Sequence, residues 1–214
     1  MRIPKHIAII PDGNRRWAKN KGFDKHEGYT YGLEPAVCSL NLCKKYGVKE
    51  VTYYGFTTDN CKRPKAQVEA FATACVDAVK LIEDKEVSLL VVGNTKSALF
   101  PEELLPYTTR TNPNEENFTR VNILVNYGWE WDLSGLNQDA TSRKTIQGAI
   151  KSHDVSRIDL IIRLGGRCRL SGLLPIQSVY SDIFCLDDMW PDFCDEHFEK
   201  ALQWYNTQDI TLGG

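Results

Sequence analysis

Short apolar runs alternate along the chain with stretches in which apolar residues recur every three or four positions. Runs of the first kind, when they are rich in β-branched and aromatic residues, are typical of buried strands. Six such strands are predicted, over residues 7–10, 51–56, 87–92, 121–125, 158–162 and 183–185. Because helical patterns separate them, we predict one α/β domain over residues 1–214, in which helices flank a six-stranded, mainly parallel sheet.

The clearest helical spacing follows the second predicted strand and indicates a helix over residues 68–82 with one apolar face. The apolar positions of this face are Val68, Phe71, Cys75, Val79 and Ile82. Other helices are predicted near residue 14, after residue 101, and over residues 33–43, 173–181 and 195–205. Residues 134–156 show no clear period, and we expect a mobile loop there.

Composition and charge exclude several classes of protein. The 214 residues are 42% apolar, which is too high for a disordered chain. The formal net charge is −2, which argues against a protein that coats nucleic acid, so no nucleic-acid partner is expected. No apolar run approaches the roughly 20 residues that a transmembrane segment needs.

The cysteines indicate the redox environment that we expect. Their number is odd and no two are spaced as CxxC, which argues against a disulfide framework and a structural zinc site. We therefore expect a reduced, cytoplasmic protein in which most cysteines are small apolar packing residues. The seven are Cys38, Cys43, Cys61, Cys75, Cys168, Cys185 and Cys194.

Polar residues follow the ends of several predicted strands, and these ends meet at one edge of a parallel sheet. After the first strand, Gly13 permits close backbone approach, Asn14 starts a helix, and Arg15 and Arg16 add positive charge. Asp12 would repel a phosphate group unless a cation such as Mg²⁺ lay between them. A simple Asp-Gly turn is the alternative interpretation of this segment.

A second cluster follows the fifth predicted strand. Arg163, Arg167 and Arg169 surround a glycine pair and precede Ser171. Guanidinium groups match phosphate oxygens, and a glycine pair exposes backbone donors, so we predict a small phosphorylated ligand here. A solvated basic loop is the alternative.

These segments together resemble the cis-prenyltransferases, the undecaprenyl diphosphate synthase family. The similarity extends in the expected order over residues 6–18, 54–60, 63–64, 126–128, 159–163, 169–171 and 190–193. The resemblance implies a homodimeric α/β protein with an apolar tunnel. It also implies that Mg²⁺ is required and that a prenyl group is transferred from an allylic diphosphate to a second isoprenoid diphosphate.

The resemblance also implies a role for individual residues. Asp12, Asn60 and Arg16 would act at the reacting centre, and Asp12 and Asp182 would hold the metal. The allylic diphosphate would be bound by Gly13, Asn14, Arg15, Arg16, Trp17, Lys25, Tyr29, Thr57 and Arg63. The second diphosphate would be bound by Arg163, Arg167, Arg169 and Ser171.

The chain departs from the usual family pattern mainly around the second diphosphate. The family usually has Glu at the positions of Asp182 and Arg167, Trp at the position of Cys61, and Arg-x-Gly where this chain has Thr211-Leu212-Gly213. Asp12 is kept. This combination resembles the lavandulyl and cyclolavandulyl diphosphate synthases, which join two dimethylallyl diphosphates head-to-middle.

We therefore predict irregular coupling to a short product. Regular head-to-tail elongation with isopentenyl diphosphate and a non-catalytic partner subunit are the alternatives. Glu130, Tyr29 and a bound diphosphate are the candidates for the group that removes the final proton.

Overall fold

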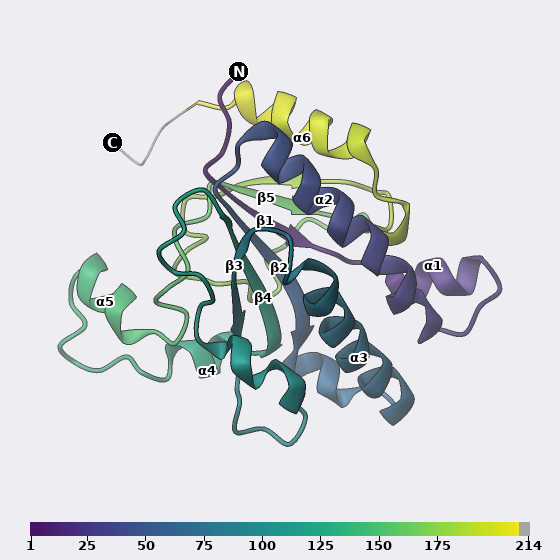
Figure 1. Cartoon of the computed structure of the whole chain (residues 1–214), viewed down its shortest axis with the longest axis horizontal. Coiled ribbons are helices and arrows are strands. Elements are labelled where there is room, and N and C mark those ends of the chain that lie inside the picture. Colours follow the sequence, from purple (N-terminus) through teal and green to yellow (C-terminus); the bar gives the residue numbers. More distant parts are fainter. Residues whose placement is uncertain (210–214) are drawn as a thin grey trace.

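The computed structural model describes residues 1–209. Its central element is one sheet of six parallel strands. The strands are β1 (His6–Ile10), β2 (Glu50–Thr57), β3 (Val87–Val92), β4 (Thr119–Tyr127), β5 (Leu160–Arg163) and β6 (Asp182–Cys185). They lie in the order β3-β4-β2-β1-β5-β6, and every neighbouring pair is parallel (Figure 1). The predicted single α/β domain with six strands is therefore confirmed.

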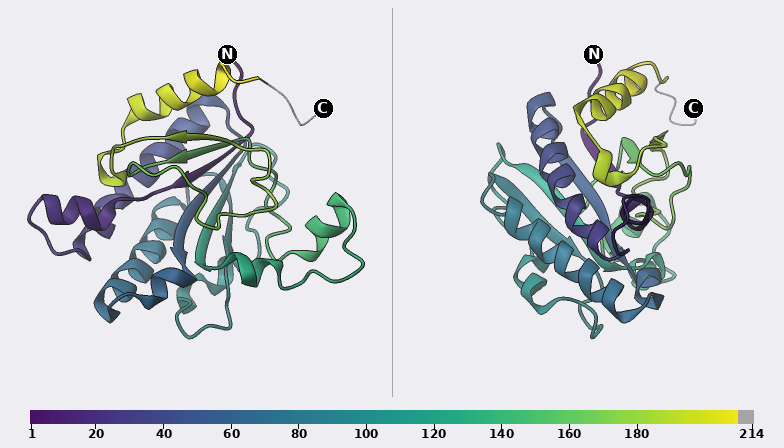
Figure 2. Two further views of the ribbon diagram at one scale, coloured as in Figure 1. Left: turned by 180° about the vertical axis from the view of Figure 1, so that it is seen from behind. Right: turned by 90° about the vertical axis from the view of Figure 1, so that its right-hand side faces the viewer.

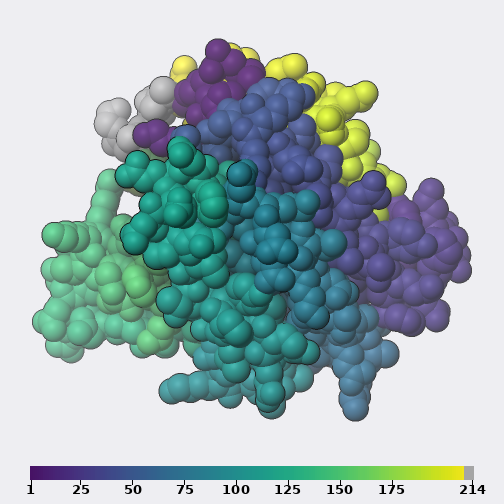
Figure 3. Space-filling view, viewed as in Figure 1, coloured from purple at the N-terminus to yellow at the C-terminus, as the bar shows by residue number. Residues whose placement is uncertain are grey.

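Three long helices pack together on one side of this sheet. They are α2 (Leu33–Tyr46), α3 (Lys65–Ile82) and α6 (Asp195–Asn206). The view turned by 90° in Figure 2 shows α2 and α3 side by side on one side of the strands, and both fill the middle of the face drawn in Figure 3. All three match helices that the apolar spacing predicted.

The remaining helices are short. The α-helices are α1 (Asn14–Asn20), α4 (Trp129–Leu133) and α5 (Arg143–Ala149). The 3₁₀ helices are Glu27–Gly32, Thr58–Lys62, Glu102–Thr108 and Trp190–Asp192. Among the described residues, no helix is long and apolar enough to cross a membrane.

Apolar side chains cover both faces of the sheet, which explains why the strands appear as continuous apolar runs in the sequence. On β1, Ile7 and Ile9 point into the core beneath α2, α3 and α6, whereas Ala8 and Ile10 join a second cluster on the opposite face. All four are almost fully buried. The sheet is thus the middle layer of the molecule, and its ends are free to carry polar groups.

One prediction about the second half of the chain is wrong. Residues 173–181 form turns and not a helix, because Leu174 has a positive φ of 32° and precedes Pro175. The Ser178 hydroxyl donates to the carbonyls of Leu173 and Leu174. Residues 134–156, the stretch with no clear period, contain the short helix α5, and Asp154 and Ser156 near their end contact Arg120 and Glu50; their mobility stays a prediction.

The prediction that the cysteines are reduced is also wrong at two positions. Cys168 and Cys185 form a disulfide. Odd number and scattered spacing exclude a regular framework, but they do not exclude a single bond between residues that the fold brings together. Cys43 and Cys75 are free and buried in the core, as predicted for packing residues, and burial raises the pKa of the Cys75 thiol to about 12.

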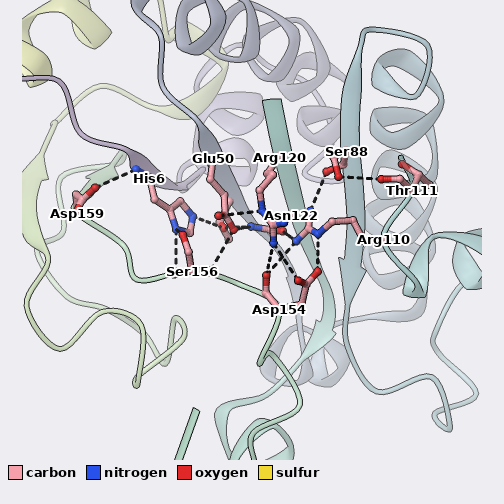
Figure 4. A network of polar contacts seen from close by, with 11 residues as sticks. His6, Glu50, Ser88, Arg110, Thr111, Arg120, Asn122, Asp154, Ser156 and Asp159 are labelled. Carbon is pink, nitrogen blue, oxygen red and sulfur yellow. Dashed lines mark hydrogen bonds and ion pairs between the residues drawn. The ribbon is translucent and has the colours of Figure 1, made fainter. Parts of the chain in front are cut away.

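A network of polar side chains, about half of them buried, lies at the amino end of the sheet (Figure 4). We call it the amino-end network. It contains His6, Glu50, Thr52, Ser88, Arg110, Thr111, Arg120, Asn122, Asp154, Ser156 and Asp159. Its members come from four strands and from the segments before β4 and β5, so it joins parts of the chain that are far apart in sequence.

Asn122 lies at the centre of the amino-end network. Its amide nitrogen donates to Glu50 Oε1 at 2.7 Å and to Thr52 Oγ1 at 2.9 Å, and its oxygen accepts from Arg110 at 2.7 Å. His6 Nε2 lies 2.8 Å from the same Thr52 hydroxyl. Burial lowers the pKa of His6, although Glu50 acts in the opposite direction. These contacts give His6 a structural role at the amino end of the sheet.

Candidate active site

A cavity of about 570 Å³ opens at the carboxyl ends of β1, β2 and β5. Eight basic and two acidic side chains line it, so it carries a large excess of positive charge and suits anions. The basic residues are Arg15, Arg16, Lys19, Lys25, Arg63, Arg163, Arg167 and Arg169. The acidic residues are Asp12 and Asp59. The strand ends therefore converge on one site, as the sequence predicted.

Asp12 lies between the two arginine groups of this cavity. Its Oδ2 is 3.1 Å from Arg163 Nη2, and its Oδ1 is 3.4 Å from Arg16 Nη2. The Asp12 side chain is 30% exposed and faces the cavity, whereas Arg163 is only 3% exposed. Burial lowers the pKa of Arg163, and Asp12 counteracts this effect. A buried guanidinium thus depends on one carboxylate that a ligand can still reach.

The turn after β1 requires glycine. Gly13 has a φ of 108°, and a Cβ at this position would lie 2.8 Å from Met189 Cβ. This conformation lets the backbone turn at once into α1, where Arg15 and Arg16 follow Asn14. Arg16 Nη2 also donates to the Gly165 carbonyl at 2.9 Å, which connects the first cluster to the second.

The second cluster forms what we call the arginine loop, residues 163–171. Its two glycines have positive φ angles of 84° and 69°, which favour glycine. Arg163 Nη1 donates to Ser171 Oγ at 2.9 Å and to the Arg169 carbonyl. The loop therefore folds back on the guanidinium group from which it starts, and Arg167 and Arg169 line the cavity.

The segment after β2 completes the opposite wall. Asn60 Oδ1 accepts from the Thr57 amide at 3.1 Å and fixes the start of the 3₁₀ helix Thr58–Lys62. Arg63 Nη1 donates to the Tyr29 hydroxyl at 2.9 Å. Burial lowers the pKa of Arg63. Tyr29 and Arg63 are thus held together at the cavity wall.

An apolar cavity of about 80 Å³ adjoins the basic one. Tyr29 and Phe71 line both cavities, and their rings stack with centroids 4.5 Å apart. We call these two residues the aromatic pair. Phe56 packs edge-on against Phe71 from the core at 5.4 Å, which supports the pair from behind. The other lining residues are mostly apolar: Pro11, Asn14, Gly32, Leu33, Ala36, Tyr53, Gly55, Ala74, Cys75, Ala78, Ile82, Ile123 and Trp190.

The family model described as "Putative undecaprenyl diphosphate synthase" matches residues 10–213. The chain belongs to this family. It is accordingly a prenyltransferase of the cis-prenyl diphosphate synthase type, and the family implies isoprenoid diphosphates as its substrates. The anion-binding cavity beside an apolar one is consistent with substrates of this kind.

Curated relatives in the family cover nearly the whole chain. An isoprenyl transferase from Thermotoga maritima is 31% identical, over 100% of this chain and 98% of its own length. A second relative, from Yersinia pseudotuberculosis, is a ditrans,polycis-undecaprenyl-diphosphate synthase ((2E,6E)-farnesyl-diphosphate specific). It is 30% identical, over 100% of this chain and 91% of its own length. The corresponding synthase of Aliivibrio fischeri is 28% identical, over 99% of this chain and 89% of its own length.

A solved member of similar fold is lavandulyl diphosphate synthase from Lavandula x intermedia, in complex with dimethylallyl diphosphate. Its crystal structure superposes with a TM-score of 0.86 over 99% of this chain and 98% of that one. The sequence identity is 21%, so the comparison establishes the fold of this undecaprenyl diphosphate synthase family member. The predicted cis-prenyltransferase fold is confirmed.

The cavity brings together nearly all the residues that the family resemblance selected. They are Asp12, Gly13, Asn14, Arg15, Arg16, Lys25, Tyr29, Thr57, Asn60, Arg63, Arg163, Arg167, Arg169 and Ser171. Trp17 is not among them. Its indole nitrogen donates to Asp192 at 2.7 Å, and its ring packs against Tyr31 on the outside of α1.

Asp182 is also separate from this cavity. It starts β6 in register with Leu160, whereas Arg163, three residues further along β5, reaches the cavity. It lies 4.0 Å from Arg2. Within residues 1–209 no group of three or more His, Cys, Asp and Glu side chains is arranged to hold a metal ion. The altered segment Thr211-Leu212-Gly213 lies outside the described residues.

Several residues that line the cavity were not among the predicted site residues, and Lys19 and Phe71 illustrate why. Lys19 lies four positions after Arg15 on α1, and this helical spacing was a usable signal. Phe71 was predicted on the apolar face of its helix but not singled out as a site residue, because a one-dimensional apolar period does not distinguish a core position from one that lines a cavity.

Proposed function

We propose that this prenyltransferase joins two short isoprenoid diphosphates by irregular, head-to-middle coupling, with dimethylallyl diphosphate as the allylic substrate. The small size of the apolar cavity is the observation that carries this proposal. A space of about 80 Å³ behind the aromatic pair suits a single isoprene unit and leaves no room for a long polyprenyl chain. The lavandulyl diphosphate synthase of similar fold was crystallised with the same allylic diphosphate.

The allylic diphosphate is proposed to bind the cations around α1. Arg15, Arg16, Lys25 and Arg63 all line the cavity, and Arg63 donates to Tyr29 of the aromatic pair. When the C–O bond breaks, its electron pair leaves with the diphosphate, and these cations stabilise the growing negative charge. The faces of Tyr29 and Phe71 then stabilise the allylic cation. Trp17 and Asp182 do not line this cavity, so we do not propose that they bind the substrate or the metal in the same chain.

The second diphosphate is proposed to bind the arginine loop. Arg167, a cation where the family usually has a carboxylate, extends the positive charge of Arg163 and Arg169. The double bond of the second substrate attacks the allylic carbon and forms the new C–C bond. A proton then leaves, and Glu130, Tyr29 or the released diphosphate accepts it. Glu130 lines a neighbouring cavity of about 380 Å³ that shares Arg169 and Ser171 with the main one.

Mg²⁺ is the proposed cofactor, and Asp12 fits it. Mg²⁺ in such sites is held by one or two carboxylates together with substrate phosphate oxygens and water. Asp12 offers one reachable carboxylate among cations that bind the phosphates. When bound, the ion would neutralise charge on the leaving diphosphate. Asn60 and Arg16 are proposed to position the reacting groups beside it.

We also propose that the protein is a homodimer. This proposal follows the family resemblance, and the edge of the sheet supports it. All four residues of the edge strand β6 are only half-buried, and Val179 and Tyr180 before it are 61% and 40% exposed. Sedimentation velocity at micromolar concentration tests it, with a dimer as the expected mass.

Regular head-to-tail elongation is the second candidate function, because curated relatives of the chain include undecaprenyl diphosphate synthases. One assay separates it from the first. The protein is incubated with Mg²⁺ and dimethylallyl diphosphate, with and without isopentenyl diphosphate, and the dephosphorylated alcohols are identified. A branched ten-carbon alcohol from dimethylallyl diphosphate alone is expected. Linear products that require isopentenyl diphosphate would establish elongation, and no product under either condition would favour a non-catalytic subunit.

A further inference from the structure

The disulfide joins the arginine loop to the edge of the sheet. Cys168 lies on the exposed part of the loop, between the two arginines that line the cavity, and Cys185 is the last residue of β6. Their Cα atoms are 5.7 Å apart. The bond therefore attaches the cavity-lining part of a loop without regular secondary structure to a strand of the core sheet.

The start and the end of the arginine loop are held by other contacts. At its start, the amides of Gly165 and Gly166 donate to the carbonyls of Asp188 and Leu186 at 2.7 and 2.8 Å. At its end, Ser171 accepts from Arg163 through its hydroxyl and from Tyr54 through its carbonyl. These contacts leave the loop anchored at both ends whether or not the disulfide is present.

The middle of the loop has no such support. In the part of the chain that the structure describes, neither Arg167 nor Cys168 makes a hydrogen bond or an ion pair, and the Arg169 guanidinium makes none either. Arg167 and Arg169 are exposed. Among residues 1–209, the disulfide is thus the one specific bond at residues 167 and 168, and the only other contact on this stretch is the one that Arg163 makes with the Arg169 carbonyl.

We propose that the Cys168–Cys185 disulfide positions Arg167 and Arg169 for the second diphosphate, and that its reduction weakens binding there. The identity of the ligand rests on the proposed function. The physical reason is entropic: a long cationic side chain on an unrestrained backbone must be ordered when it binds, and this cost lowers the affinity. The site around Asp12 and α1 has its own contacts and keeps its affinity.

The chemical step is an ordinary thiol–disulfide exchange with a dithiol as reductant. A thiolate of the dithiol attacks one sulfur of the disulfide and forms a mixed disulfide, which its second thiol then resolves. The protein gains two electrons and two protons as two thiols, and the dithiol becomes a disulfide. Exposure of Cys168 gives the reductant access. Oxidised glutathione, a disulfide, reverses the exchange.

The first experiment asks whether the bond forms in solution. The protein is equilibrated with oxidised glutathione, alkylated, digested and examined by mass spectrometry, with and without prior treatment with dithiothreitol. A linked pair of peptides that contain Cys168 and Cys185 is expected before reduction, and two alkylated cysteines after it. Alkylated Cys168 and Cys185 under the oxidising condition would overturn the proposal.

The second experiment measures binding of inorganic pyrophosphate by calorimetry in the oxidised and reduced protein. Reduction is expected to weaken one of two binding sites about tenfold, the size expected for ordering two long side chains, and to leave the other within twofold. The double variant C168S/C185S is expected to bind pyrophosphate like the reduced protein, with an affinity that dithiothreitol does not change. This control excludes effects of the five other cysteines. Equal binding in both redox states would overturn the proposal.

Turnover distinguishes this inference from the proposed function. A protein that shows redox-dependent pyrophosphate binding but no head-to-middle product would refute the proposed function alone. A protein that makes the product with the same KM and kcat when oxidised and reduced would refute the role of the disulfide alone. The expected result is a higher KM on reduction, with kcat within twofold.

Discussion

The two ends of the sheet both carry polar side chains, but they differ in how charge is balanced. In the amino-end network, Glu50 and Asp154 meet Arg120 and Arg110 at 2.5–3.3 Å, and the amide of Asn122 lies between them. In the cavity at the carboxyl end, eight basic side chains face two acidic ones. The first region satisfies its charges within the chain, and the second leaves positive charge for ligands.

The comparison shows that polarity at a strand end does not by itself indicate a binding site. A buried charge without a partner costs several kcal/mol, so a network that is closed on itself contributes to folding or to its specificity. A cavity in which like charges accumulate destabilises the empty protein and is stabilised by an anion. Changes in the amino-end network should therefore affect stability, and changes in the cavity should affect turnover.

The largest effect is expected for Asp12→Ala. This variant removes the carboxylate that lies between Arg16 and Arg163, and we expect kcat to fall by at least about 10²- to 10³-fold, as for the loss of a key electrostatic group. Product formation from radiolabelled dimethylallyl diphosphate measures it. Asp84→Ala, an exposed carboxylate between α3 and β3, is the control and should be fully active. Normal turnover in Asp12→Ala would remove the chemical distinction between the two regions.

The next effect is expected for Glu50→Ala in the amino-end network. Glu50 is 3% exposed, and its loss removes one of the two acceptors of the Asn122 amide and one of the two carboxylates that pair with Arg120. We expect the free energy of unfolding in urea to fall by about 3 kcal/mol, with kcat of the folded protein unchanged. Glu69→Ala is the control, because its pair with Lys65 is exposed and worth less than about 1 kcal/mol. A stable but inactive Glu50→Ala protein would contradict the division of roles.

A smaller effect is expected for Phe71→Ala, which sharpens the assignment of the apolar cavity. Removal of one ring of the aromatic pair enlarges the space of about 80 Å³ and should raise kcat/KM for geranyl diphosphate relative to dimethylallyl diphosphate about tenfold. Competition between the two allylic substrates measures the ratio. Phe23→Ala, in which an exposed ring outside both cavities is removed, should leave the ratio unaltered.

The smallest effect concerns pH. Because burial lowers the pKa of His6 in the folded protein, the unfolded chain binds the extra proton first as the pH falls below 6.5. Stability is therefore complete above the unfolded pKa and is lost as the pH falls towards the folded pKa, with a slope of at most about 1.4 kcal/mol per pH unit. Urea unfolding between pH 5 and 8 measures this slope, and His6→Gln should flatten it. An equal slope in His6→Gln would show that other groups carry it.

The free energy of unfolding continues to fall at lower pH, where carboxyl groups take up protons. Burial acts to raise the pKa of Glu50, but His6, Ser156, Asn122 and Arg120 outweigh it and the pKa is lowered. The pKa of Asp154 is likewise lowered, since Arg110 and Arg120 outweigh its burial. Below the ordinary carboxyl range, protonation of these groups removes further stability.

The sequence was informative where local pattern decides structure. All six strands and the helices α2, α3 and α6 follow from apolar spacing, and the cavity follows from polar residues at strand ends. The order of the strands does not, because parallel pairing joins segments that are distant along the chain. The turns over residues 173–181 were missed because Leu174 adopts a conformation that an apolar period does not reveal.

The amino-end network and the disulfide were missed for a different reason. Glu50, Arg110 and Asn122 are ordinary residues in sequence, and only the register of β2 with β4 brings Glu50 and Asn122 together. Cys168 and Cys185 meet because β5 and β6 end at the same level. Contacts of this kind depend on the three-dimensional arrangement and leave no local signal.

Asp12 has a consequence for the order in which ligands enter. Because one carboxylate contacts both Arg16 and Arg163, whatever draws Asp12 towards the first diphosphate also frees Arg163 for the second. The two occupancies are therefore thermodynamically linked, and by reciprocity each ligand changes the affinity of the other by the same factor. The proposed function therefore predicts that binding of the two diphosphates is coupled through this single shared side chain.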